Sequence, residues 1–141
     1  MLLNFTIGFG LIGLGAFVHV FGLIWITRGM NWMAARFRWQ SGSILAMILV
    51  VIGLFLLLLL QAWMWAVCYD IVDAFPDFLT SLYFSMATFA TLGMGDVVPM
   101  HQWRFLAALE SLSGFLFIGW STAYLVSASM RLGPFRSGEH F

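Results

Sequence analysis

Charged side chains are scarce in this chain, and their scarcity excludes most soluble proteins. Only 9% of the 141 residues are charged and 62% are hydrophobic, whereas about a quarter of the residues in a typical soluble domain are charged. Lysine is absent, so the chain has no basic tract of the kind that binds nucleic acid. The single cysteine, Cys68, excludes an intrachain disulfide. We therefore expect a one-domain integral membrane protein without a nucleic-acid partner.

Sequence features of enzymes are missing as well. The chain has no glycine-rich phosphate loop followed by lysine, no cysteine–histidine cluster for a metal and no plausible pairing of a nucleophile with a base. His101 and His140 stand alone in loop or terminal positions. We predict that the protein is not an enzyme and that it uses no cofactor.

Long apolar stretches dominate what is present. Three of them are long enough to cross a bilayer, which takes about 20 residues. They run from about Phe5 to Thr27, from Ser43 to Tyr69 and from Phe105 to Met130. A fourth stretch, residues 77–90, reaches little more than halfway across at about 1.5 Å per residue. The pattern predicts an all-α membrane protein with three transmembrane helices and a re-entrant half-spanning helix.

The half-spanning stretch has the start signals of a helix. Pro76 suits the first helical position, and Asp77 places negative charge in the opening turn, where the helix dipole favours it. The opposite end of such a helix would offer partial negative charge to a cation.

A glycine-containing segment follows directly. Residues 88–96 read Thr-Phe-Ala-Thr-Leu-Gly-Met-Gly-Asp. Gly93 and Gly95 can adopt backbone angles closed to other residues, so the chain can run extended with successive carbonyl oxygens facing one axis. Irregular backbone at membrane depth is tolerated where it lines a water-filled cavity or is buried in protein. Because rings of such oxygens replace the hydration shell of a passing ion, the segment suits a cation pore.

This segment resembles the selectivity filter of the potassium channel superfamily, whose common form is Thr-Val-Gly-Tyr-Gly-Asp. The match holds at Thr88, Thr91, Gly93, Gly95 and Asp96. It extends to Leu82-Tyr83-Phe84-Ser85, which looks like the pore helix of the family, and to Pro99 and Trp103 beyond the filter.

The resemblance implies a pore domain over residues 43–131. An extra transmembrane helix and a cytoplasmic interfacial loop would precede it at residues 1–42, and a short cytoplasmic tail would follow at residues 132–141. Because the family encloses its filter with four such loops, a homotetramer around a central pore is implied.

The resemblance also implies a set of ion-binding and supporting residues. Oxygen atoms for potassium ions would come, mostly from the backbone, from Thr91, Leu92, Gly93, Met94 and Gly95. Support for the filter would come from Thr88, Asp96 and Glu110.

Met94 is the main departure from the family pattern, because the usual residue is an aromatic one that braces the filter. A thioether is softer and cannot hydrogen-bond as a phenol does. We therefore keep three functions open: a potassium channel, a weakly selective cation channel, and a non-conducting subunit with a channel-like fold that regulates other proteins.

The placement of charge predicts an orientation. Arginines lie between the first two spans and after the third, at Arg28, Arg36, Arg38, Arg131 and Arg136. Acidic residues dominate between the second and third spans. Basic loops stay cytoplasmic, so we expect the N-terminus outside and the C-terminus inside, in a bacterial inner membrane. Anionic lipid could bind at Arg28, Arg36 and Arg38.

Glu110 is the acidic residue within a predicted span, where an ionisable group needs a partner. We expect it behind the filter near the hydroxyls of Ser81, Ser85 or Thr88, as a gating or pH-sensitive contact or as a satisfied polar brace.

Glycines and a histidine within the spans allow two interpretations each. Gly114 and Gly119 are hinge candidates, although glycines also permit close helix packing. Glycines recur every seven residues along the first span, at Gly8, Gly15 and Gly22. His19 lies on this stripe, where it could respond to pH or be a neutral, hydrogen-bonded histidine.

Overall fold

The computed structural model describes residues 2–36 and 39–132, and these residues are almost entirely helical, with no strand among them. The elements are α1 (Leu2–Arg36), α2 (Trp39–Ile71), α3 (Phe78–Phe89), the short 3-10 helix η1 (His101–Trp103) and α4 (Arg104–Leu132). Three stretches are long and apolar enough to cross a membrane: Leu2–Arg36, Gly42–Ile71 and His101–Arg131. The 12 residues of α3 cover only about 18 Å at the usual rise per residue. The predicted all-α membrane fold is confirmed.

The first helix is longer than predicted. It does not end near Thr27 but continues through Arg28 to Arg36. Residues 28–36 contain no proline and several alanine, methionine and arginine residues, which favour helix. Gly29 is a weak helix former, but the residues after it carry the helix past the membrane boundary. Arg38 and the predicted tail after residue 132 lie outside the described residues.

The chain leaves α2 through a helix-ending motif. The N–H of Ala74 donates to the carbonyl of Tyr69, and the N–H of Asp73 donates to that of Asp70. Asp73 has a φ of 50°, and this pair of bonds with a left-handed residue is a Schellman motif. Aspartate tolerates the left-handed conformation better than most residues.

The start of α3 differs from the prediction by two positions. Pro76 is not the first helical residue, because the helix begins at Phe78 and Asp77 is its N-cap. The Asp77 carboxylate accepts hydrogen bonds from the backbone N–H and the hydroxyl of Thr80. Since the first N–H groups of a helix have no partner within it, this carboxylate determines where α3 begins.

The chain divides into two compact units. Unit 1 comprises Met1–Val18 and Leu58–Ile118, and unit 2 comprises His19–Leu57 and Gly119–Phe141. The helices α1, α2 and α4 each contribute one part to each unit, whereas α3 and η1 belong to unit 1 alone.

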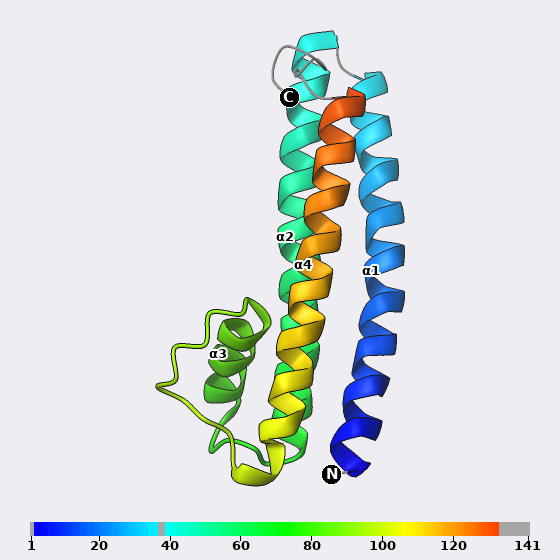
Figure 1. Ribbon diagram of the computed structural model, residues 1–141. Coiled ribbons are helices and arrows are strands. Elements are labelled where there is room, and N and C mark those ends of the chain that lie inside the picture. Colours follow the sequence, from blue (N-terminus) through cyan, green and yellow to red (C-terminus); the bar gives the residue numbers. More distant parts are fainter. Residues whose placement is uncertain (1, 37–38, 133–141) are drawn as a thin grey trace. The chain divides into compact units, whose positions relative to one another are not determined.

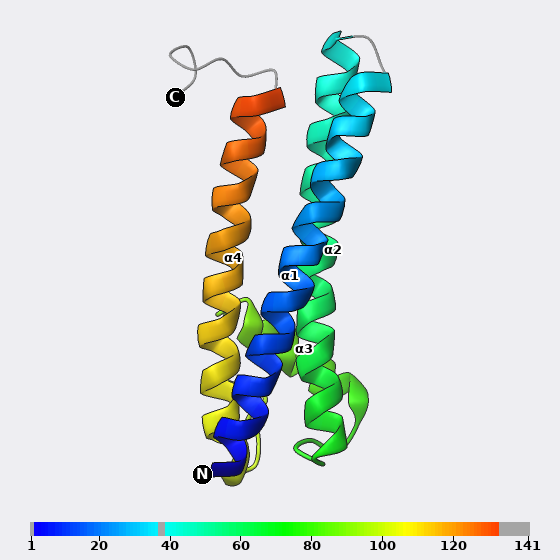
Figure 2. The same ribbon diagram turned by 90° about the vertical axis from the view of Figure 1, so that its right-hand side faces the viewer.

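Unit 1 is built around α3. This helix lies on one side of α2 and α4, and the first part of α1 lies on their other side (Figure 1; Figure 2). Three aromatic rings, those of Tyr69, Phe75 and Phe84, contact one another with centroids 4.7 to 5.7 Å apart. Aromatic pairs of this kind stabilise a core beyond their buried area. The aromatic cluster therefore joins the end of α2 to α3.

The glycine stripe of α1 contacts different helices in the two units. In unit 1, Gly8 faces Leu109 and Gly15 faces Phe117, both on α4. In unit 2, Gly22 faces Leu57 on α2, where an added Cβ would lie 2.5 Å from a leucine methyl group. The small residues of this stripe thus allow close approach of a neighbouring helix, which is their usual role in membranes.

Gly114 lies where the end of α3 approaches α4 closely. A Cβ atom there would lie 2.0 Å from the carbonyl oxygen of Phe89, at the end of α3. Because the obstructing atom is backbone, it cannot rotate away. At Gly119 a Cβ would meet no atom within 4 Å. Packing accounts for the glycine at position 114 and does not account for the one at position 119.

The Asp77 cap makes the stability of α3 depend on pH. The hydrogen bonds from the Thr80 side chain and backbone hold the pKa of the Asp77 carboxyl below its usual value. The stabilisation is present at neutral pH and is lost as the pH falls through the lowered pKa. We expect Asp77→Ala to increase amide hydrogen exchange in α3 at neutral pH, with little further increase on acidification. Asp70→Ala, which removes an exposed carboxylate at the end of α2, should leave that exchange unchanged; equal exchange in Asp77→Ala and wild type would contradict the cap.

Gly114→Ala should separate α3 from α4. Overpacking usually costs about 1–3 kcal/mol, and the backbone clash places this substitution at the upper end. A large loss of thermal stability in detergent is the expected measurement. The matched variant Gly119→Ala should melt like wild type. If Gly114→Ala were as stable as Gly119→Ala, the packing assignment would be wrong.

Candidate functional site

The glycine-containing segment begins where α3 ends. The N–H of Leu92 donates to the carbonyl of Ala87, and the N–H of Thr91 to that of Thr88. Thr91 has a φ of 58°, so it is the left-handed residue of a second Schellman motif. The first residue of the segment is thereby positioned by the end of the helix.

Backbone conformation alternates along the rest of the segment. The φ angles of Gly93 and Gly95 are 56° and 77°, whereas Leu92 and Met94, which lie between the positive-φ residues, do not have positive φ. When residues with positive φ alternate with residues with negative φ, neighbouring peptide groups turn to the same side of the chain. Such a strip of backbone dipoles can surround an ion.

Thr91 adopts this conformation at a cost. A β-branched residue with positive φ is an outlier, and a residue held in such a region stores on the order of 1–3 kcal/mol of strain. Glycine would remove the strain, but it would also remove the hydroxyl group. Strained residues of this type are typical of functional sites.

A tyrosine of α3 holds the far end of the segment. The Tyr83 hydroxyl donates to Asp96 Oδ2 at 2.8 Å and lies 3.2 Å from Met94 Sδ. Sequence reasoning named Tyr83 only as part of the stretch that resembles a pore helix and predicted no contact for it. A signal for its role was available in the sequence. Tyr83 carries a hydroxyl group on the half-spanning helix and directly precedes Phe84 and Ser85, which are buried. The resemblance predicts an aromatic residue at position 94, where this chain has methionine. The neighbouring helix α3 supplies a phenol instead, from Tyr83.

The middle of the segment has few neighbours within the chain. Leu92 and Met94 are each 60% exposed, and a Cβ added to Gly93 or Gly95 would meet no atom within 4 Å. Between α3 and the segment lies a cavity of about 30 Å³, lined in part by Thr88. Its volume suits about one water molecule.

Glu110 joins three helices behind this segment. Its side chain is fully buried. Oε2 accepts a hydrogen bond of 2.7 Å from the Tyr69 hydroxyl on α2, and Oε1 pairs with the Ser85 hydroxyl on α3. Ser85 Oγ also lies 2.7 Å from the carbonyl oxygen of Ala62. Of the three expected hydroxyls, Ser85 is the one that pairs with Glu110.

Tyr69 was missed by sequence reasoning. A buried carboxyl needs polar partners, and few residues of the second apolar stretch carry a hydroxyl group. That scarcity is the signal that could have identified it.

Two of the residues predicted to have functional roles, His19 and Gly119, belong to unit 2. His19 is fully buried, and its ring is tilted against the Trp120 indole with centroids 5.0 Å apart. Gly119 stands at the unit boundary.

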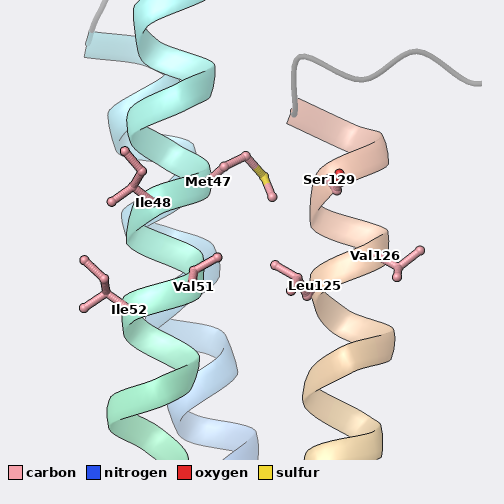
Figure 3. A pocket seen from close by; sticks show the side chains of 7 residues that line it. All are labelled: Met47, Ile48, Val51, Ile52, Leu125, Val126 and Ser129. Carbon is pink, nitrogen blue, oxygen red and sulfur yellow. The ribbon is translucent and has the colours of Figure 1, made fainter. Parts of the chain in front are cut away.

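Unit 2 also contains a groove of about 500 Å³ between α2 and α4 (Figure 3). Its lining is apolar except for one hydroxyl, that of Ser129; the other residues are Met47, Ile48, Val51, Ile52, Leu125 and Val126. A groove without carbonyl or charged ligands does not suit an ion site.

Comparison with known proteins adds an independent observation. The family described as Ion channel matches residues 50–131, which include α3, the glycine-containing segment and nearly all of α4. No curated protein and no solved structure matches the chain. The family match covers more than half of the chain, so this protein belongs to the ion channel family and carries a pore domain of the potassium channel superfamily type.

Proposed function

We propose that the protein is a homotetrameric channel that conducts potassium ions passively through a filter formed by residues 91–95. The observation that carries this proposal is the alternating backbone of these residues, with positive φ at Thr91, Gly93 and Gly95. Four such strips around an axis would present rings of carbonyl oxygens, which replace the water shell of a potassium ion. The Thr91 hydroxyl would add a ring at the inner end.

The half-spanning helix supports the same function. The C-terminal end of α3 leads directly into Thr91. A helix carries partial negative charge at this end. In a tetramer, four such ends would lower the energy of a cation in the cavity below the filter.

Exposure of the filter segment supports assembly. Residues 91–96 are exposed in the single chain. Polar backbone at membrane depth must be buried in protein or line a water-filled cavity. Association of four chains around the segment meets this requirement, because each chain contributes one such loop.

The charge pattern supports the orientation proposed for the chain. Arg28 and Arg36 lie in the last part of α1, and Arg131 lies in the last turn of α4. Positive residues remain on the cytoplasmic side. We therefore propose an inner-membrane location with the N-terminus outside, and anionic lipid at Arg28, Arg36 and Arg38.

A weakly selective cation channel is the second candidate. Met94 is 60% exposed, and a flexible thioether defines a pore diameter less rigidly than an aromatic ring does. The Tyr83 hydroxyl contacts both Asp96 and Met94 Sδ, but its contact with Met94 is made to the end of a flexible side chain.

Reversal potential distinguishes these candidates. The purified chain is reconstituted in liposomes under opposed potassium and sodium gradients, and cross-linking checks for a four-chain species. We expect a reversal potential near the potassium equilibrium value. A clear current that reverses near zero would instead favour the second candidate and make Met94→Tyr the next variant. Four-chain particles without current would favour a non-conducting subunit.

Gly93→Ala should abolish the flux. An added Cβ would meet no atom within 4 Å, so only the backbone angle opposes alanine. A left-handed alanine costs about 1–2 kcal/mol, and a tetramer would contain four copies. The matched control is Gly13→Ala in α1, which also has open space around its Cβ. Undiminished flux in Gly93→Ala would remove the filter assignment.

A further inference from the structure

The hydrogen bonds in the buried cluster of Glu110, Tyr69 and Ser85 require a proton on the Glu110 carboxyl group. We propose that Glu110 is a neutral carboxylic acid whose proton completes the contact between α2, α3 and α4, and that losing this proton reduces conduction. The second half of this proposal rests on the proposed channel function and names a regulation of its filter.

The contacts in this cluster need more hydrogens than its two hydroxyl groups supply. The cluster contains three oxygen–oxygen contacts: Tyr69 to Glu110, Ser85 to Glu110, and Ser85 to the Ala62 carbonyl. Each contact at hydrogen-bond distance needs one hydrogen between its oxygens. The Tyr69 and Ser85 hydroxyls supply one hydrogen each, and a backbone carbonyl supplies none. The third hydrogen must come from Glu110.

Only one arrangement gives each of the three contacts its own hydrogen. Tyr69 donates to Glu110 Oε2, and Ser85 donates to the Ala62 carbonyl, which can only accept. Glu110 Oε1 then donates to Ser85 Oγ. If Glu110 were ionised, Ser85 would have to choose one acceptor, and the other contact would bring two oxygen lone pairs together.

The surroundings of Glu110 favour the neutral form. Its side chain is fully buried, and both partners of its carboxyl group are uncharged hydroxyls. A carboxylate in such a place would be desolvated without a compensating cation, which costs far more than burying the acid.

The titratable groups around this cluster are few. On α2 they are the Tyr69 phenol and, within electrostatic reach, the Cys68 thiol. On α3 the tyrosine at position 83 instead bonds to Asp96. The part of α1 in unit 1, residues 2–18, has no titratable side chain. On α4 the nearest is Arg104, six positions away and exposed.

Loss of the proton would be transmitted to the filter through α3. Ser85 lies on the helix whose C-terminal motif positions Thr91 and whose Tyr83 holds Asp96. An unpaired contact at Ser85 would push this helix away from α2 or α4. Both anchors of the filter segment would then shift together, and alkaline conditions would lower the flux.

Infrared spectroscopy of the purified chain in lipid tests the protonation without requiring conduction. The wild-type chain should show a carboxylic acid carbonyl band at neutral pH that shifts in heavy water and disappears on alkaline titration. This band should be missing from Glu110→Gln and retained in Asp70→Asn, which loses an exposed carboxyl. A wild-type spectrum without a protonated carboxyl at neutral pH would overturn the proposal.

Flux in liposomes over the same pH range tests the regulation. Glutamine keeps all three contacts, because its amide donates to Ser85 and its carbonyl accepts from Tyr69. Glu110→Gln should conduct at every pH, whereas wild type and Cys68→Ser should lose most of their flux as the pH rises. A parallel alkaline decline in wild type and Glu110→Gln would overturn the regulatory role. Absence of current in every variant, with the band present, would support the neutral acid and overturn conduction.

Discussion

The hydrogen-bonded junction at Glu110 is the interaction on which the arrangement of unit 1 depends. In water, an apolar helix such as α3 would be driven against its neighbours by the hydrophobic effect. In a membrane that force is largely lost, because lipid tails are as apolar as the neighbouring helices. Hydrogen bonds and close packing must therefore determine where α3 lies. Glu110 supplies both an acceptor for α2 and a partner for α3.

The proposed filter segment, residues 91–96, is held by α3 at both of its ends. At one end, the helix-ending motif holds Thr91 in a left-handed conformation. At the other end, Tyr83 of the same helix holds Asp96. Between these anchors the backbone has little contact with its own chain. A segment fixed at its ends and open along its middle is suited to be completed by other copies of itself.

The first helix is more than an addition to this arrangement. Its Gly8 and Gly15 pack against α4, and the side chain of Asn4 donates a 2.7 Å hydrogen bond to the carbonyl of Gln102 in η1. In addition, Gln61 of α2 donates to the carbonyl of Gly15. Small residues and polar side chains are the usual means of helix association in membranes, so α1 braces the helices that flank α3.

The sequence by itself determined the helices, the half-spanning element and the family, because these depend on local composition and spacing. Long apolar runs predict spans, and two glycines after a short helix predict an irregular segment. The choice of Ser85 among the three hydroxyls expected near Glu110, the contact with Tyr69, the role of Tyr83 and the backbone contact at Gly114 were decided only by the tertiary structure. They join residues 13 to 41 positions apart, and no periodic pattern records which side chains meet across such separations. The first residue of α3 was predicted two positions too early because Pro76 and Asp77 both favour a helix start, and only the bond to Thr80 selects between them.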